Sequence, residues 1–76
     1  MGPVPRPPGG FLETQDRLVG RVPARWRNAD GDRLWEWDPL HGHIEGYNRR
    51  GRHIGVFDAM TGQRIGEAKK GRSIDV

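Results

Sequence analysis

Cysteine is absent from this 76-residue chain, and so is any long apolar run. Without thiols, neither a disulfide framework nor a thiolate zinc site can stabilise the fold. The chain also lacks the roughly 20 consecutive apolar residues that span a bilayer, so we expect no membrane segment in it. Hydrophobic residues make up 33% of the sequence and aromatic residues 8%. This composition predicts one small domain with a marginal core.

Lysine is scarce as well, because eleven of the thirteen basic residues are arginine. Arginine suits bidentate contacts with phosphate better than lysine does. The charge is unevenly spread: residues 46–76 carry a net charge of +4, whereas residues 1–45 carry −1. A basic half of this kind favours a nucleic acid or an acidic protein as partner.

Four of the six prolines lie in residues 1–10, MGPVPRPPGG. Proline fixes φ and cannot donate a backbone hydrogen bond, so we expect 1–10 to be a flexible lead or linker and 11–76 to be the folded domain. Within that domain, residues 11–19 are expected to hold a short helical turn, and residues 20–31 to be irregular.

Short strands are predicted for the rest of the chain, where alternating side chains are bounded by turn residues. The predicted strands cover residues 33–38, 42–47, 53–58 and 63–67. They indicate a mainly β fold, a strongly twisted antiparallel sheet of four to five short strands with a short helical or irregular N-terminal segment. The predicted core consists of Trp35 or Trp37, Ile44, Ile54, Val56 and Phe57.

The strand predicted over 42–47 is unusual because its polar face carries most of the chemistry. If the extended backbone begins at His41, a period of two places His41, His43, Glu45 and Tyr47 on one side. The opposite side shows only one isoleucine between two glycines.

Such a set suits cleavage of RNA by its own 2′-hydroxyl group. A base must take the hydroxyl proton, an acid must protonate the departing 5′-oxygen, and a cation must stabilise the phosphorane. A carboxylate such as Glu45, an imidazole such as His41 beside Asp38, and an arginine meet these needs without metal. Residues four apart on an ideal strand are separated by roughly 13 Å, so we expect a bend near Gly42.

Two other functions fit the same residues. A non-catalytic RNA- or ribosome-binding module would use the basic C-terminal tail, residues 68–76. A metal-dependent nuclease would hold an ion through His41, His43 and Asp38. Trp26 either stacks on a base or folds over the sheet edge.

The run from Glu36 to Tyr47, EWDPLHGHIEGY, resembles the active-site strand of a known toxin family. In the cytotoxic ribonuclease domain of the E-group colicins, this strand reads E-W-D-x-x-H-G-x-x-E-G-Y. The resemblance extends over about residues 21–74. At position 43 this chain has histidine where the colicin domain has an acid.

The resemblance implies a toxin endoribonuclease that cleaves small-subunit (16S) ribosomal RNA in the decoding region and stops translation, with no cofactor or metal. By matching position, Glu45 would be the general base, and His41 would be the acid or a group that polarises the phosphate. Asp38 would orient His41, and Arg72 would stabilise the phosphorane. The residues expected to bind RNA are Trp26, Tyr47, Arg49, Arg50, Arg52, His53, Lys69 and Lys70.

The same resemblance implies two macromolecular partners. One is the ribosome with its 16S RNA, and the other is an acidic cognate immunity protein that neutralises the toxin in its producer. The domain would leave the producer cell as part of a larger toxin and act in the cytoplasm of the target cell.

Overall fold

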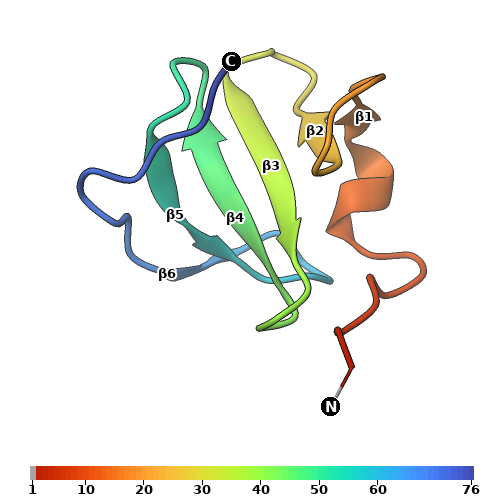
Figure 1. Ribbon diagram of the computed structural model, residues 1–76. Coiled ribbons are helices and arrows are strands. Elements are labelled where there is room, and N and C mark those ends of the chain that lie inside the picture. The colour runs from red at the N-terminus through yellow and green to blue at the C-terminus, as the bar shows by residue number, and fades with distance from the viewer. Residues whose placement is uncertain (1) are drawn as a thin grey trace.

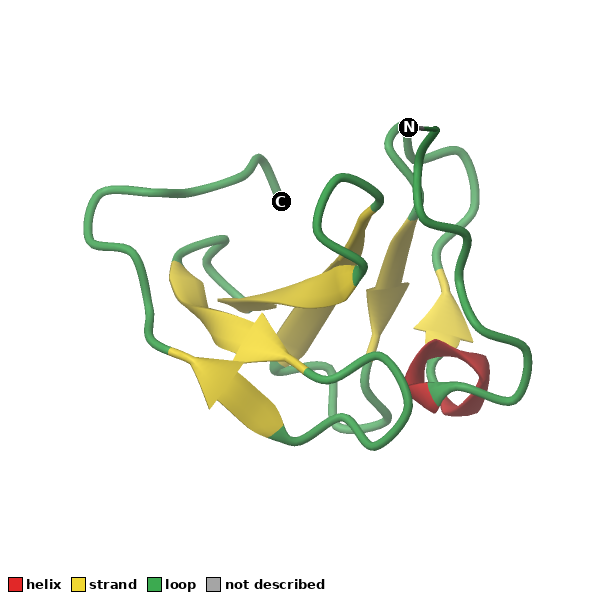
Figure 2. Cartoon of the chain, turned by 90° about the horizontal axis from the view of Figure 1, so that it is seen from below, coloured by secondary structure: helices red, strands yellow, loops and turns green. Residues whose placement is uncertain are grey.

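The computed structural model describes residues 2–76. They form one antiparallel sheet of six strands in the order β1-β2-β3-β4-β5-β6, so each strand pairs with its neighbour in sequence (Figure 1). The elements are the 3-10 helix η1 (Phe11–Thr14) and the strands β1 (Asp16–Arg17), β2 (Arg25–Arg27), β3 (Arg33–Asp38), β4 (His43–Asn48), β5 (His53–Phe57) and β6 (Arg64–Gly66). Figure 2 shows the sheet strongly curved, with η1 at one end. The predicted mainly β fold is confirmed.

The number of strands was underestimated, because the structure has six rather than four to five. The four predicted strands match β3 to β6 within one residue at each end. The additional strands β1 and β2 lie in segments predicted to be helical or irregular. They are two and three residues long, too short for alternation to show, and they form because β2 pairs with β3 through Trp26 and Trp35.

The core lies on one face of the sheet, beneath η1. Its buried members are Leu12, Trp26, Trp35, Ile44 and Phe57. The ring of Trp35 makes edge-to-face contacts with Phe11 and Phe57, at centroid distances of 5.3 and 4.8 Å. These aromatic contacts unite the N-terminal helix with the central strands.

The core prediction holds for Trp35, Ile44 and Phe57 but was wrong for one residue. Val56 is only half-buried and lies on the other face, because it is the cross-strand partner of Glu45. Ile54 is also half-buried, and it packs against the core from beside an irregularity in the β4–β5 register.

Gly46 in β4 lets the aromatic rings approach the strand. A Cβ atom at this position would lie 2.3 Å from the Phe57 ring and 3.0 Å from the Trp35 ring. A larger residue would therefore push both rings out of the core. The absence of a side chain here is a packing requirement of the sheet.

Val4, in the N-terminal segment, lies beside the turn that joins β3 and β4. The backbone N–H of Val4 donates to the carbonyl of Pro39 at 2.8 Å, and the Trp37 indole N–H donates to the Val4 carbonyl at 3.0 Å. The boundary between a lead at 1–10 and a domain at 11–76 stays a prediction, and residue 1 lies outside the described residues. Within residues 2–76, no helix has the length and apolarity needed to cross a membrane.

The C-terminal segment returns to the sheet and is anchored there. The Ile74 N–H donates to the Gly51 carbonyl at 2.8 Å, and the His53 N–H donates to the Arg72 carbonyl at 3.0 Å. The buried guanidinium of Arg25 donates to the Asp75 carbonyl at 2.6 Å. Together these bonds carry Arg72 back to the central strands.

Candidate active site

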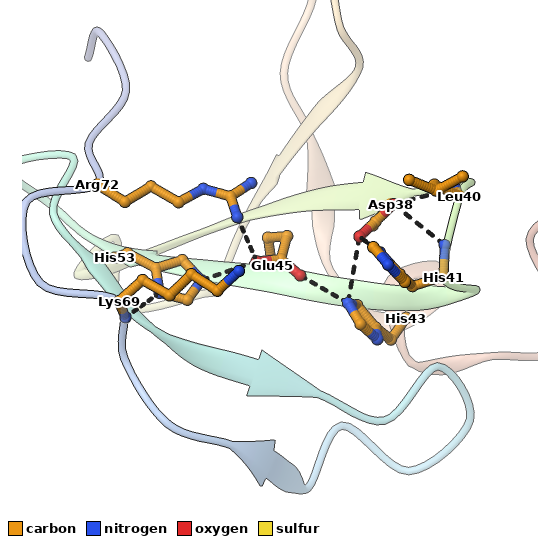
Figure 3. A network of polar contacts seen from close by, with 8 residues as sticks. All are labelled: Asp38, Leu40, His41, His43, Glu45, His53, Lys69 and Arg72. Carbon is orange, nitrogen blue, oxygen red and sulfur yellow. Dashed lines mark hydrogen bonds and ion pairs between the residues drawn. The ribbon is translucent and has the colours of Figure 1, made fainter.

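The polar face of the central hairpin gathers the predicted catalytic residues (Figure 3). In the β3–β4 register, Asp38 pairs with His43, and Glu36 pairs with Glu45. Cross-strand partners point to the same face of a sheet, so all four side chains lie opposite the tryptophans. The alternation of Trp35 and Trp37 with acidic residues in β3 thus separates the core from the site.

Glu45 is the centre of the site and is nearly buried, with a side chain only 5% exposed. Its Oε2 atom lies 2.8 Å from Nε2 of His43. Its Oε1 atom lies 2.8 Å from Nε2 of His53 and 3.2 Å from a terminal guanidinium nitrogen of Arg72. Three donors therefore surround one carboxylate, as a buried charge requires.

His53 is fixed in one tautomer and donates a hydrogen bond to Glu45. The backbone N–H of Lys69 donates to Nδ1 of His53 at 2.9 Å, so Nδ1 is an acceptor and carries no proton. The proton must then be on Nε2, which donates to Glu45 at 2.8 Å. The His53 side chain is fully buried, at 0% exposure, so it supports the carboxylate from within the protein.

Asp38 and His41 meet because a tight turn follows β3. Oδ1 of Asp38 accepts the N–H groups of Leu40 and His41, and Gly42 closes the turn at a φ of +71°. Oδ2 of Asp38 lies 2.8 Å from Nδ1 of His41. The bend expected near Gly42 is present, and it removes His41 from the strand.

The electrostatics of Asp38 follow from this turn. Partial burial opposes its ionisation, but the hydrogen bonds from the His41 side chain and from the N–H groups of His41 and Leu40 outweigh burial. Together they hold the pKa of the Asp38 carboxyl below its ordinary value. Asp38 is therefore an anion that can orient the His41 imidazole.

The same turn occurs a second time between β5 and β6. Asp58 accepts the N–H groups of Met60 and Thr61 at 2.9 and 2.8 Å, and the Thr61 hydroxyl at 3.1 Å. Gly62 closes it at a φ of +73°, as Gly42 closes the first. Both turns begin with aspartate and end with glycine. This local sequence pattern therefore accounts for the shared turn conformation.

His43 bridges the two carboxylates. Its Nε2 atom lies 2.8 Å from Glu45 and 3.2 Å from Oδ2 of Asp38. Its ring stacks on that of His41 with an interplanar angle of 10°. One ligand atom from each of Asp38, His41 and His43 lies within 4.8 Å of the others, a spacing that can hold a metal ion.

Tyr47 closes the site from the far end of β4. Its side chain is buried, and its ring lies edge-on to that of His53 at 5.3 Å. Burial raises the pKa of the Tyr47 phenol against the opposing effect of the Arg72 guanidinium. The phenol is therefore neutral across the physiological pH range.

The structure brings the four predicted catalytic residues into one network, in which His43 links Asp38–His41 to Glu45–Arg72. The predicted RNA-binding residues divide into two groups. The exposed group consists of Arg49, Arg50, Arg52, Lys69 and Lys70. The buried group consists of Trp26, Tyr47 and His53.

Three of these exposed cations line a basic hollow beside the site. The hollow has a volume of about 470 Å³, and its lining includes Arg52, Lys69, Lys70 and Arg72. Trp26, in contrast, lies in the core on the opposite face, 4% exposed beneath the guanidinium groups of Arg6 and Arg17. Base stacking by Trp26 stays a prediction, and it would require those groups to move aside.

Sequence reasoning missed two features of the site. It placed His43 on the face of Glu45, as a possible metal ligand and an added positive charge, but it did not predict that His43 contacts both carboxylates. It also missed the ion pair between Arg25 and Glu36, at 3.1 Å, which holds the guanidinium that anchors the tail. Arg25 lies in the basic strand β2 and Glu36 in the adjacent strand β3. Their pairing could be predicted only after β2 had been identified as a strand.

Comparison with known proteins places the chain in a family. The family described as Cytotoxic matches residues 13–75. Colicin E3 of Escherichia coli is 37% identical over 57 residues, which make up 74% of this chain and 10% of colicin E3. Colicin-E6 and cloacin, both of Escherichia coli, are each 38% identical over 57 residues. The chain therefore belongs to the Cytotoxic family of colicin-type nuclease domains.

These relatives are much longer proteins. Each match includes 74% of this chain, but it spans only about a tenth of the length of colicin E3, colicin-E6 or cloacin. The family match over residues 13–75 includes the central hairpin formed by β3 and β4.

Proposed function

We propose that this chain is a toxin endoribonuclease that cleaves 16S ribosomal RNA in the decoding region and so inhibits translation. The observation that carries the proposal is the environment of Glu45. A nearly buried carboxylate lies between two histidines and an arginine, with an aspartate–histidine pair beside it. This arrangement supplies a base, an acid and a cation on one face of the sheet.

Glu45 is the general base in this mechanism. It takes the proton of the 2′-hydroxyl group as that oxygen attacks phosphorus. The contact between Arg72 and Oε1 is the longest of the three, at 3.2 Å, and the Arg72 side chain is 43% exposed. When Arg72 turns toward the phosphate, His53 still holds Glu45 in place, and a lone pair of Oε1 becomes free for the proton.

His41 is the general acid. Its Nδ1 atom faces Asp38, and the side chain is 61% exposed, so Nε2 is the nitrogen available to substrate. Protonated His41 donates to the departing 5′-oxygen from the side opposite to attack. Asp38 fixes the ring and stabilises the imidazolium, while Arg72 stabilises the charge that develops on the phosphorane. None of these steps requires a metal ion.

The basic hollow supports binding of a polyanionic substrate. Arg52, Lys69 and Lys70 surround it next to Arg72, and all are exposed. This hollow also favours the second candidate, a non-catalytic RNA- or ribosome-binding module. In both cases the ribosome and its 16S RNA are the target.

Delivery and neutralisation belong to the same proposal. The chain spans about a tenth of its curated relatives, and we infer that it is carried from the producer cell within a larger toxin and acts in the target cytoplasm. An acidic cognate immunity protein would protect the producer by covering the basic surface.

Replacement of Glu45 by glutamine tests the function. The amide keeps the shape but cannot take a proton, so cleavage of 16S RNA in isolated ribosomes should slow on the order of 10²–10⁴-fold. Primer extension measures the cleavage, and co-sedimentation with ribosomes should be unchanged.

Two further results complete this test. If Glu45→Gln inhibits translation as strongly as the native chain, the binding module replaces the enzyme. Cleavage of a short decoding-site RNA should continue in excess EDTA, and its loss there would contradict the metal-independent mechanism.

A further inference from the structure

Three potential metal ligands converge at the end of the central hairpin. Asp38 is the last residue of β3, His43 is the first of β4, and His41 lies in the turn between them. Nδ1 of His41 lies 2.8 Å, and Nε2 of His43 lies 3.2 Å, from the same atom, Oδ2 of Asp38 (Figure 3). Two imidazole nitrogens thus point at one carboxylate oxygen.

The spacing of these atoms is close to that of a tetrahedral metal site. Zinc–nitrogen and zinc–oxygen bonds of about 2.0–2.2 Å place neighbouring tetrahedral ligands roughly 3.3–3.6 Å apart. The observed contacts of 2.8 and 3.2 Å with Asp38 need only a small expansion, and one ligand atom from each of the three residues lies within 4.8 Å of the others. The rings of His41 and His43 stack with an interplanar angle of 10°, so one ring must rotate for both nitrogens to face one ion.

Solvent can reach the site and complete the coordination. The side chain of His41 is 61% exposed, while those of His43 and Asp38 are 24% and 19% exposed. An ion can therefore enter from solvent and keep a water molecule as its fourth ligand. Two imidazoles favour Zn²⁺ or Co²⁺ over Mg²⁺, which prefers oxygen ligands in an octahedron.

We propose that Asp38, His41 and His43 form a binding site for a divalent transition-metal ion such as Zn²⁺, and that the bound ion inhibits the enzyme. Binding follows from the three side chains alone, whereas inhibition rests on the proposed function. The magnesium that ribosomes require does not compete for this site.

Inhibition follows from what the ion displaces. Coordination by His41 Nδ1 replaces its 2.8 Å hydrogen bond with Asp38, so Asp38 no longer orients the ring toward substrate. Coordination by His43 Nε2 also breaks its 2.8 Å contact with Glu45. Both the acid and the surroundings of the base are therefore altered by a single ion.

Titration of the full chain with Co²⁺ and Zn²⁺, without RNA, tests the binding. Visible absorption of Co²⁺ and calorimetry with Zn²⁺ should each report one ion per chain. Replacement of His43 by glutamine, and separately of the exposed His41 by asparagine, should weaken binding at least tenfold. Asp58→Asn alters the matching turn, which holds threonine in place of the histidine, and should bind as the native chain does.

Absence of one-to-one binding, or equal binding by the two histidine variants, would overturn the proposal. A second measurement follows RNA cleavage with and without Zn²⁺, each variant being compared with its own metal-free rate. Zinc should slow the native chain at least tenfold, reversibly with EDTA, and should spare His43→Gln. Binding without inhibition overturns the inhibitory role, whereas binding by a chain that cleaves no RNA leaves the site intact and refutes the proposed function.

Discussion

At the scale of single residues, the site depends on a carboxylate that does not face water. Each oxygen of the Glu45 carboxylate has at least one donor within 3.2 Å. The partners differ in freedom, since His53 is fully buried and Arg72 is 43% exposed. The buried His53 therefore suits a supporting role, whereas Arg72 is accessible to a substrate.

Arg72→Ala should reduce the rate of 16S RNA cleavage on the order of 10²–10³-fold, because it removes a donor to charge that develops in the transition state. Arg72→Lys should restore only part of the rate, since an ammonium lacks the forked pair of donors. Single-turnover cleavage of ribosomes measures both. Arg21→Ala, which removes an exposed arginine from the β1–β2 loop, is the matched control, and native cleavage by Arg72→Ala would refute the assignment.

The pH dependence of stability should include a contribution from Asp58. Hydrogen bonds from Thr61 and Met60 hold the pKa of this carboxyl below its ordinary value of 3.8. A lowered folded-state pKa gives stability that is complete above the unfolded pKa and is lost as pH falls through the folded one. The difference in melting temperature between the native chain and Asp58→Asn should therefore be constant above about pH 5 and shrink below pH 4. A difference that persists unchanged at pH 2 would contradict this.

The sequence predicted which residues share a face of a strand, but it did not predict contacts between segments that are distant in sequence. A period of two correctly placed His43 and Glu45 on one face, because alternation is a local property of strands. It could not show that His43 touches Asp38 as well. The contact between Arg72 and Glu45 depends on the return of the tail, which Arg25 anchors from a strand that sequence reasoning did not identify.

At the scale of elements, the length of a strand decided whether it could be predicted. β3 and β4 each have six residues and show clear alternation, and their bounds were predicted within one residue. β1 and β2 are short, and they form through pairing with a neighbour rather than through local propensity. The ordered C-terminal tail could not be predicted for the same reason, because its β-bridge between Arg52 and Ser73 joins segments that are distant in sequence.

Phe57→Ala should destabilise the sheet by about 3–5 kcal/mol, because it empties a buried site between β5 and the Trp35 ring. For a domain of this size, the loss can abolish folding. Ile65→Ala in β6 is the control, since Ile65 is 59% exposed and should change the free energy of unfolding by less than about 0.5 kcal/mol. Urea denaturation measures both, and a native midpoint for Phe57→Ala would contradict the packing described.

At the scale of the whole molecule, charge and core are segregated. The tryptophan core occupies one face of the sheet, and the active-site network and basic tail occupy the other. Residues 46–76 carry a net charge of +4. An acidic partner would approach this side by electrostatic attraction.

Association with an acidic immunity protein should therefore slow steeply as salt is raised, because the Debye length is only about 10 Å at 0.1 M. Stopped-flow measurement over a range of sodium chloride gives the dependence. Combined replacement of Arg49, Arg50 and Arg52 by alanine should make the association rate less dependent on salt concentration. An association rate that does not respond to salt would show that the basic turn has no part in recognition.

The repeated turn means that the chain carries a second copy of the loop that holds its proposed acid. Asp38-Pro39-Leu40-His41-Gly42 and Asp58-Ala59-Met60-Thr61-Gly62 share the bonds from the fourth and fifth residues to the first. The fourth side chain differs: the His41 imidazole contacts Asp38, and the Thr61 hydroxyl contacts Asp58. The same backbone turn therefore holds two different side chains against an aspartate. One substitution in such a turn is enough to set an imidazole against a carboxylate, which makes this loop an accessible starting point for the evolution of acid catalysis.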